Sequence, residues 1–175
     1  MRKQFTLRKM VLTALFTALT CVATMLIQIQ MPATQGYVNI GDCFVLLGAW
    51  VLGPWFGAFA GGVGSALADL LAGYPHYIPG TLLIKALMAV IAALLYRQLG
   101  KKHHYVGQLV GGVAAELWMV LGYFVYAWLI LGKGLAAASS IPGNLLQGVI
   151  GLVAAIALVA ALRESKTLEK VNVNG

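Results

Sequence analysis

The sequence predicts an all-α integral membrane protein with six transmembrane helices in one bundle. Of its 175 residues, 61% are hydrophobic and only 10% are charged, and the mean hydropathy is +0.87. Water-soluble domains carry about 25% charged residues, so this chain has too little polar surface for one. Its apolar residues fall into runs near the roughly 20 residues that a helix needs to cross a bilayer. We expect residues 1–175 to form a single domain in the cell membrane.

Prolines, glycines and basic residues divide the apolar sequence into helices. The first run, 10–31, ends at Pro32 and is too long for the apolar part of a signal peptide, so we expect it to be retained. The break Gly53-Pro54 divides the next stretch into helices 40–52 and 55–72. Helices 81–97 and 106–131 flank a basic gap, and Pro142 suits the first turn of helix 141–162.

The net charge of +7 is concentrated beside the apolar runs. Ten of the twelve basic residues lie in three short flanks: Arg2, Lys3, Arg8 and Lys9; Arg97, Lys101 and Lys102; Arg163, Lys166 and Lys170. Short basic flanks of this kind mark the cytoplasmic side of membrane proteins. Six spans place all three flanks and both termini in the cytoplasm, whereas five spans would put the middle flank outside. This distribution indicates contact with the lipid bilayer and no nucleic-acid partner.

Four polar residues interrupt the apolar runs in the half of the bundle that we expect to face outward: Asp69, Lys85, Asn144 and Gln147. Asp42 is expected near them, at the outer surface. Polar groups in hydrocarbon are costly unless they are paired or face a wet cavity, so their default interpretation is a functional site. We expect a polar cavity, open to the outside, that captures a small solute.

Each polar residue also has a structural interpretation. Asp69 and Lys85 flank one loop, so an ion pair between them would pin that hairpin, or Lys85 is free to meet a ligand. Asn144 and Gln147 share a helix face and offer amide groups to a neutral heterocycle, or they bond neighbouring helices. Glu116, near the midplane, forms the pocket floor, pairs with Lys85 or is protonated.

Aromatic residues on the fifth predicted helix have two expected roles. Tyr126 and Trp128 lie near its outer end, where aromatic residues form the membrane-interface belt. Trp118 and Tyr123 lie deeper, and we expect them to stack on a flat ring.

Small residues recur at a spacing of four. Gly53, Gly57 and Gly61 predict close helix packing, and Ala14 and Ala18 form a similar pair on the first helix. From this spacing alone, internal packing is the default interpretation of the alanine pair.

Sequence motifs of catalysis are absent. The chain has no GxxxxGK[ST] phosphate loop, no HExxH and no GxSxG, and Cys21 and Cys43 lack metal-ligand spacing. We therefore expect neither an enzyme nor a metal or cofactor site, with no catalytic residues to assign.

Several segments together carry a family resemblance over nearly the whole chain. They are Ala14-Leu-Phe-Thr-Ala18, Gly36-Tyr-Val-Asn-Ile-Gly-Asp42, the Gly- and Pro-rich hairpin through Asp69, and Pro142-Gly-Asn144-Leu-Leu-Gln147. In this order and spacing they resemble the S component of energy-coupling factor (ECF) vitamin transporters, in the riboflavin-type group. No segment matches a particular substrate subgroup.

The resemblance implies a high-affinity binder that holds a vitamin in an outer pocket built by the first loop and helices four to six. The matching first-loop residues here are Tyr37 and Asn39. The resemblance also implies that Ala14 and Ala18 dock a transmembrane coupling subunit, the T component, which joins two cytoplasmic ATPases, and that the S component topples to release its cargo. Pyridoxine or the hydroxymethylpyrimidine precursor of thiamine is the favoured substrate, with riboflavin next.

Two other functions fit the polar residues. One is a stand-alone proton-coupled carrier in which Glu116 titrates. The other is a membrane scaffold without a ligand, in which the polar groups only lock helices together.

Overall fold

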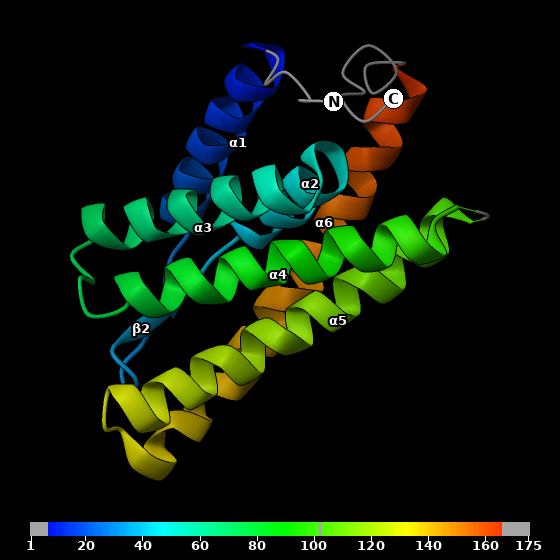
Figure 1. Cartoon of the computed structure of the whole chain (residues 1–175). Helices are drawn as coiled ribbons and strands as arrows, with labels where there is room; N and C mark the ends of the chain where they lie inside the picture. Colours follow the sequence, from blue (N-terminus) through cyan, green and yellow to red (C-terminus); the bar gives the residue numbers. More distant parts are fainter. Residues whose placement is uncertain (1–6, 102, 166–175) are drawn as a thin grey trace.

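The computed structural model describes residues 7–101 and 103–165, which form a helical bundle with one short hairpin (Figure 1). The predicted all-α class is confirmed. The elements in chain order are α1 (Leu7–Leu26), β1 (Ile29–Met31), β2 (Gly36–Val38), α2 (Asp42–Leu52), α3 (Pro54–Leu71), α4 (Ile78–Leu99), α5 (His104–Val125) and α6 (Ser140–Glu164). A π-helical turn, Tyr126–Ile130, and a 3-10 helix, Gly134–Ser139, join α5 to α6.

The α2 helix lies at the centre of the bundle, and α3 packs on it. Nearly every side chain of α2 is buried, and α3 packs against α1, α2 and α4. Glycines permit this approach: a Cβ on Gly57 would lie 2.7 Å from Ala49 Cα, and one on Gly64 would lie 2.6 Å from the Thr17 carbonyl oxygen. The predicted close packing is observed at Gly57 and at Gly61, where a Cβ would lie 2.9 Å from Val45 Cγ1, and Gly64 adds a close approach to α1 that was not predicted.

The first helix is shorter than predicted. It ends at Leu26, and the end of the predicted range 10–31 instead forms β1, which pairs antiparallel with β2. Pro32 follows β1 directly and favours an extended Met31, because a proline disfavours helix in the residue before it. Strand pairing supplies the backbone partners instead. Hydropathy could not separate the two, because Ile29 and Met31 suit either a helix or a strand.

Other helix boundaries lie within a few residues of the predicted ones. The break between α2 and α3 falls at Gly53, whose φ of 85° is favourable only for glycine, and Pro54 opens α3. α4 begins at Ile78 and α5 at His104, each before the predicted start, and α5 ends in a π turn.

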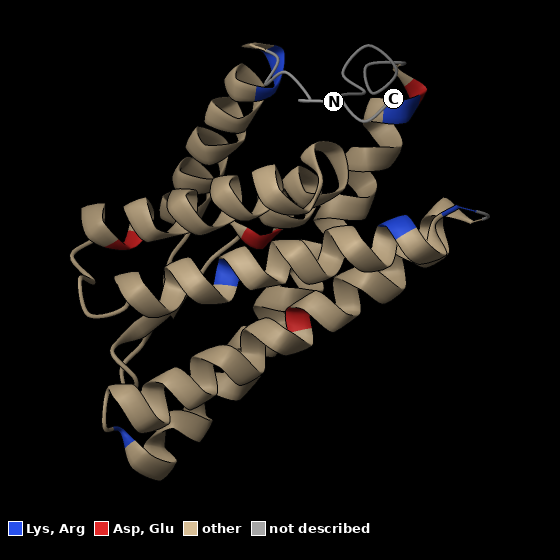
Figure 2. Ribbon diagram, viewed as in Figure 1, with Lys and Arg blue, Asp and Glu red and all other residues tan. Residues whose placement is uncertain are grey.

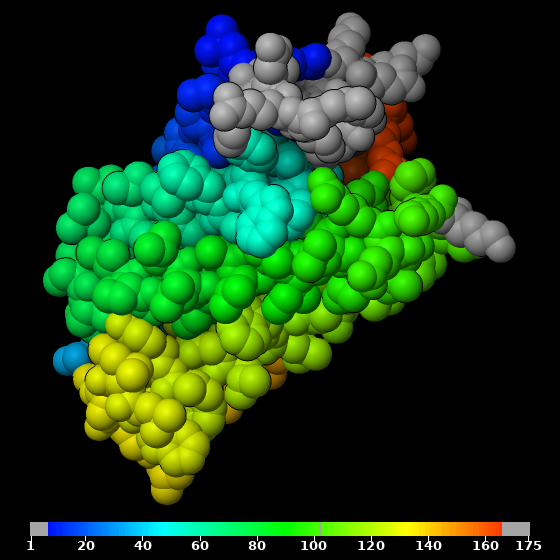
Figure 3. Space-filling model, in the orientation of Figure 1, coloured from blue at the N-terminus to red at the C-terminus, as the bar shows by residue number. Residues whose placement is uncertain are grey.

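The exterior of the bundle is apolar. Every long helix exposes large hydrophobic side chains, and Figure 3 shows α3, α4 and α5 side by side on one continuous face. In the described part of the chain, four helical stretches are long and apolar enough to cross a bilayer: Leu7–Leu26, Ile78–Leu99, His104–Ile130 and Gly134–Glu164. The protein is therefore a membrane protein with several apolar helices.

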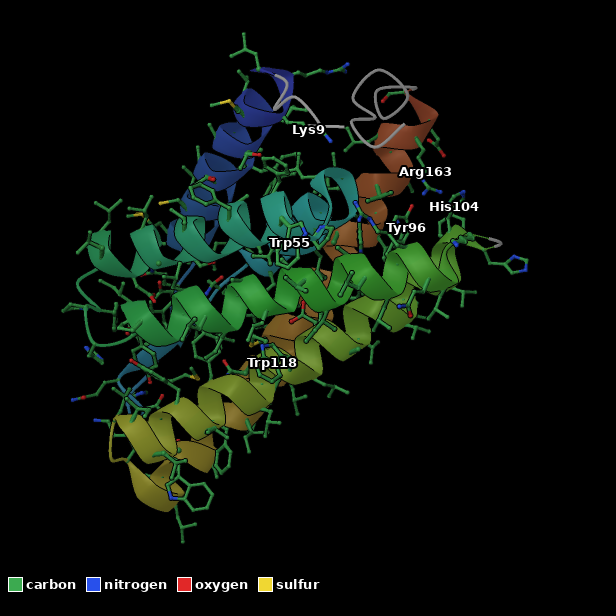
Figure 4. All side chains as sticks on the ribbon, viewed as in Figure 1. Lys9, Trp55, Tyr96, His104, Trp118 and Arg163 are labelled. Atoms are coloured by element: carbon green, nitrogen blue, oxygen red, sulfur yellow. The ribbon has the colours of Figure 1, made fainter. Side chains whose placement is uncertain are left out.

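Basic residues gather at one end of the bundle. The start of α1, the end of α6 and the turn between α4 and α5 carry them (Figure 2). Lys133 lies elsewhere, and its Nζ donates to Gln35 Oε1 in the loop between β1 and β2 at 2.7 Å. At the basic end, Arg163 Nη2 donates to the Tyr96 hydroxyl at 2.9 Å, with His104 nearby (Figure 4). The remaining members of the predicted basic flanks lie outside the described residues: Arg2, Lys3, Lys102, Lys166 and Lys170.

Candidate functional site

A polar cavity lies between the β-hairpin and the helix ends opposite the basic end. Its walls come from α1, the hairpin, α3, α4, α5 and α6, through Thr24, Met31, Thr34, Gly36, Tyr37, Asn39, Ser65, Asp69, Tyr77, Thr81, Lys85, Tyr123, Ser140, Asn144 and Gln147. The free volume is about 30 Å³, which suffices for one or two water molecules. A ring-shaped ligand would enter only if some of these side chains moved.

Asp42 organises the base of the cavity. It is fully buried at the start of α2, where it forms an ion pair with Lys85 and accepts a hydrogen bond from Gln147 Nε2 at 2.7 Å. The expected position of Asp42 at the outer surface was therefore wrong. Neither alternative for Lys85 holds, since it is paired with Asp42 rather than with Asp69 and its ammonium is not free. α2 packs directly against α4 and α6, and this brings Asp42 to both Lys85 and Gln147. The sequence reasoning considered only that Asp69 and Lys85 flank the same loop, and this did not reveal the contact with α2.

The segment after β2 fixes Asn39 and Gln147 against each other. The Asn39 backbone N–H donates to Gln147 Oε1 at 2.7 Å, and Asn39 Oδ1 accepts from the Gly41 N–H at 2.8 Å. Gly41 allows this turn, because a Cβ there would lie 2.0 Å from Thr24 Oγ1. Both polar ends of the Gln147 amide are thus engaged, one by the loop and one by Asp42.

Tyrosines close the opposite wall. The Tyr37 hydroxyl donates to Asp69 Oδ1 at 2.6 Å, and the Tyr123 hydroxyl donates to Thr81 Oγ1 at 3.1 Å. Burial, reinforced by the negative charge of Asp69, raises the pKa of the Tyr37 phenol well above its ordinary value, so this hydroxyl stays a donor. Lys85 Nζ lies 5.4 Å from the centre of the Tyr123 ring, within cation–π range.

Several polar atoms of the lining have no hydrogen-bond partner of acceptable geometry within the described residues. They are Asp69 Oδ2, Asn144 Nδ2, Ser65 Oγ and Thr24 Oγ1. Asp69 is 4% exposed and Asn144 is 3% exposed. Buried polar groups are normally satisfied by protein or water, so unused donors and acceptors around one cavity provide hydrogen bonds for a guest.

Six of the eight residues predicted to bind substrate share this cavity: Tyr37, Asn39, Lys85, Tyr123, Asn144 and Gln147. Glu116 does not line it. The Glu116 and Asp42 side chains both lie against Gly151, where a Cβ would be 2.8 Å from Asp42 Cβ and 3.4 Å from Glu116 Oε1. Glu116 is therefore behind the cavity base, on the α5–α6 side.

Trp118 also lies outside the cavity. Its indole nitrogen donates to the Ile84 carbonyl oxygen at 3.1 Å, and its ring lines an apolar groove between α4 and α5 (Figure 4). This placement assigns it to helix packing rather than to a cavity wall.

Sequence reasoning missed the hydroxyl-bearing part of the lining, namely Thr24, Thr34, Ser65, Tyr77, Thr81 and Ser140. Serine and threonine are common in membrane helices, so they gave no signal. Tyr77 carried one, since it lies in an aromatic loop between two predicted helices. Within residues 7–101 and 103–165, no group of three His, Cys, Asp or Glu residues could hold a metal ion.

Ala14 and Ala18 lie on the face of α1 that points away from the rest of the bundle. Both alanines are exposed, beside the exposed side chains of Val11, Leu15 and Val22. Internal packing within this chain is therefore not their role. The buried face of α1 is instead formed by Thr13, Phe16, Thr20, Ala23 and Thr24.

Comparison with known proteins places this architecture in a family. The model of the ECF-type riboflavin transporter S component family matches residues 4–164. The chain is 41% identical over 132 residues, 75% of its length and 86% of the relative's, to an uncharacterized protein of Pyrococcus woesei. It is 29% identical over 150 residues, 85% of its length and 84% of the relative's, to the thiamine precursor transporter HmpT of Lactococcus lactis.

The fold has also been seen in a solved structure. The S component of a bacterial ECF transporter superimposes with a TM-score of 0.68, covering 90% of this chain and 96% of that one, at 17% sequence identity. A match of the family over residues 4–164 leaves only the two ends of the chain outside it. The chain belongs to the ECF-type riboflavin transporter S component family.

Proposed function

We propose that this protein is the membrane-embedded, high-affinity substrate-binding subunit of an ECF-type ABC transporter, and that it binds a small water-soluble vitamin or vitamin precursor in the cavity under the β-hairpin. The observation that carries the proposal is the set of unused polar atoms around that cavity, on Asp69, Asn144, Ser65 and Thr24. Family membership supports a transport subunit rather than an enzyme.

The favoured ligand is a single aromatic ring, hydroxymethylpyrimidine or pyridoxine, with riboflavin next. The tyrosines at 37, 77 and 123 give the cavity flat aromatic walls, while amide and hydroxyl groups suit ring nitrogens and hydroxymethyl groups. The relative named as a thiamine precursor transporter supports the same choice.

The exposed face of α1 is proposed as the docking surface for the T component, with Ala14 and Ala18 at its centre. Small residues there would let another helix approach closely. Through that subunit the protein would act with two cytoplasmic ATPases, since it has no nucleotide-binding motif of its own.

Six spans with both termini in the cytoplasm complete the proposal. Most of the described basic residues lie at the end of the bundle opposite the cavity, apart from Lys85 in the cavity and Lys133 beside the hairpin, and this supports an outward-facing cavity. α2 has 11 residues, or roughly 17 Å at 1.5 Å per residue, less than the hydrocarbon thickness. Because α2 is enclosed by other helices, its length need not match the lipid.

The stand-alone proton-coupled carrier is not favoured. Glu116, its expected titrating group, lies behind the cavity and does not line it. Family membership also points to a subunit that works with a coupling partner.

Mass spectrometry of small molecules that co-purify with the protein tests the proposal. We expect one vitamin-like heterocycle at near-equimolar ratio, retained without ATP and released on denaturation. A protein that retains none and binds none of hydroxymethylpyrimidine, pyridoxine, thiamine and riboflavin in titrations would contradict it.

A further inference from the structure

The charged groups around the cavity leave a negative excess on its ligand-facing side. Two charged residues line the described cavity, Lys85 and Asp69. The Lys85 ammonium is paired with Asp42, and both side chains are almost fully buried. Its positive charge is therefore already neutralised before any ligand arrives.

Asp69 is not neutralised in this way. One oxygen accepts the Tyr37 hydroxyl hydrogen bond, and no described cation pairs with the carboxylate. The other oxygen, Oδ2, lacks a hydrogen bond of acceptable geometry within the described chain, although the Thr81 hydroxyl lies close to the carboxylate. The Tyr37 phenol is neutral, so it satisfies part of the hydrogen-bonding capacity of Asp69 without supplying a counter-ion.

The amide groups divide into one that is engaged and one that is available. Gln147 uses its amide oxygen for Asn39 and its amide nitrogen for Asp42. Asn144, one helical turn earlier on α6, has an amide nitrogen without a partner among the described residues. The cavity therefore offers a guest an acidic acceptor on α3 and a neutral donor on α6.

We propose that Asp69 and Asn144 select ligands by charge: the cavity accepts a neutral or cationic ring that presents an N–H or O–H donor to Asp69 and a lone pair to Asn144, and it rejects vitamins that carry a carboxylate. The 4-amino edge of a pyrimidine, with a ring nitrogen beside an amino group, has this donor and acceptor pattern. This inference rests on the proposed function and narrows its ligand class.

Matched ligand pairs provide the test. Pyridoxine and 4-pyridoxate differ by one hydroxymethyl-to-carboxylate change, as do hydroxymethylpyrimidine and its 5-carboxylate analogue. Titration calorimetry on the full-length protein in lipid nanodiscs at neutral pH should show about 100-fold weaker binding, or none, for each carboxylate, since an unpaired like charge is costly. Equal or tighter binding of the carboxylates would overturn the proposal.

An isosteric variant tests the assignment to Asp69. Asp69→Asn keeps the shape and removes the charge, so the preference for the neutral member of each pair should fall by about tenfold or more. The matched control Glu164→Gln, at the far end of α6, should keep the wild-type preference. Unchanged selectivity in Asp69→Asn would overturn the assignment.

The proposed selection of ligands by charge, here called the charge rule, and the proposed function fail in different ways. If a carboxylate vitamin such as nicotinate or biotin binds tightly, the binding function stands and the charge rule is wrong. If no member of either pair and no other vitamin binds, the proposed function itself fails, and the charge rule with it.

Discussion

Asp42 is the residue on which the geometry of the site most depends. It holds Lys85 from α4 and Gln147 from α6, and Gln147 in turn holds the Asn39 backbone of the loop. A single carboxylate at the start of α2 thus fixes three pieces of the cavity wall. Such a buried pair does not by itself guarantee net stability, but breaking one partner leaves an uncompensated charge.

Substitution of one member of this pair should therefore cost more than substitution of both. Asp42→Leu leaves the buried Lys85 ammonium unpaired, and we expect a loss of about 3–5 kcal/mol in the free energy of unfolding. The double variant Asp42→Leu/Lys85→Met should recover part of that loss. Thermal unfolding in detergent measures both variants, and strictly additive losses would show that the two residues are energetically independent.

Residue-level prediction from the sequence worked where polarity was conspicuous. Lys85, Asn144 and Gln147 interrupt apolar runs, and all three line the cavity. The hydroxyl-bearing residues of the lining were not predicted. A threonine hydroxyl in a helix commonly donates a hydrogen bond to the carbonyl oxygen four residues back, as those of Thr13 and Thr17 do. Their presence in an apolar run therefore carries no information about a cavity. Glu116 was conspicuous but was placed by depth alone, which does not say which way a helix face turns.

At the scale of elements, the glycines of α3 set the helix spacing. A Cβ on Gly57 would contact the backbone of α2 at 2.7 Å, and backbone cannot move aside as a side chain can. Gly57→Val should cost about 1–3 kcal/mol in the free energy of unfolding, as overpacking of a core does. The control Leu67→Phe adds volume on the exposed face of the same helix and should be near neutral in thermal unfolding. Equal effects of the two would contradict the packing role.

The exposed face of α1, which carries Ala14 and Ala18, gives a second prediction at this scale. Because both alanines are exposed, Ala14→Trp or Ala18→Trp should leave ligand binding by the isolated protein unchanged while it abolishes vitamin uptake by cells that contain the coupling subunits. Leu121→Trp, on the exposed face of α5, is the control and should retain uptake. Loss of binding together with uptake would show that the alanine face supports the fold rather than docking.

The sequence predicted helices well and the hairpin not at all. Breaks at Gly53 and Pro54 are visible because those residues have restricted or unusual backbone conformations. The strand Ile29–Met31 was hidden, because its pairing with Gly36–Val38 is a tertiary property of a short, half-apolar segment. This miss affects the site, since β2 leads directly to Asn39.

For the whole molecule, the segregation of basic residues predicts the orientation in the membrane. In a Cys21→Ser/Cys43→Ala background, the single cysteine introduced by Lys133→Cys should react with a membrane-impermeant maleimide in intact cells. The one introduced by Lys101→Cys should react only after permeabilisation. The reverse labelling pattern would show that the bundle has the opposite orientation, with the cavity facing the cytoplasm.

The most direct test of the central claim, that the cavity under the hairpin is the vitamin site, is a calorimetric titration of purified protein with hydroxymethylpyrimidine and pyridoxine in the absence of ATP. Wild type should bind one equivalent of at least one of them, and Asn144→Leu should lose about tenfold or more in affinity, as expected when a donor inside a binding site is removed. Gln108→Leu changes a buried amide that does not line the cavity and should bind like wild type. Undiminished affinity in Asn144→Leu would contradict the claim.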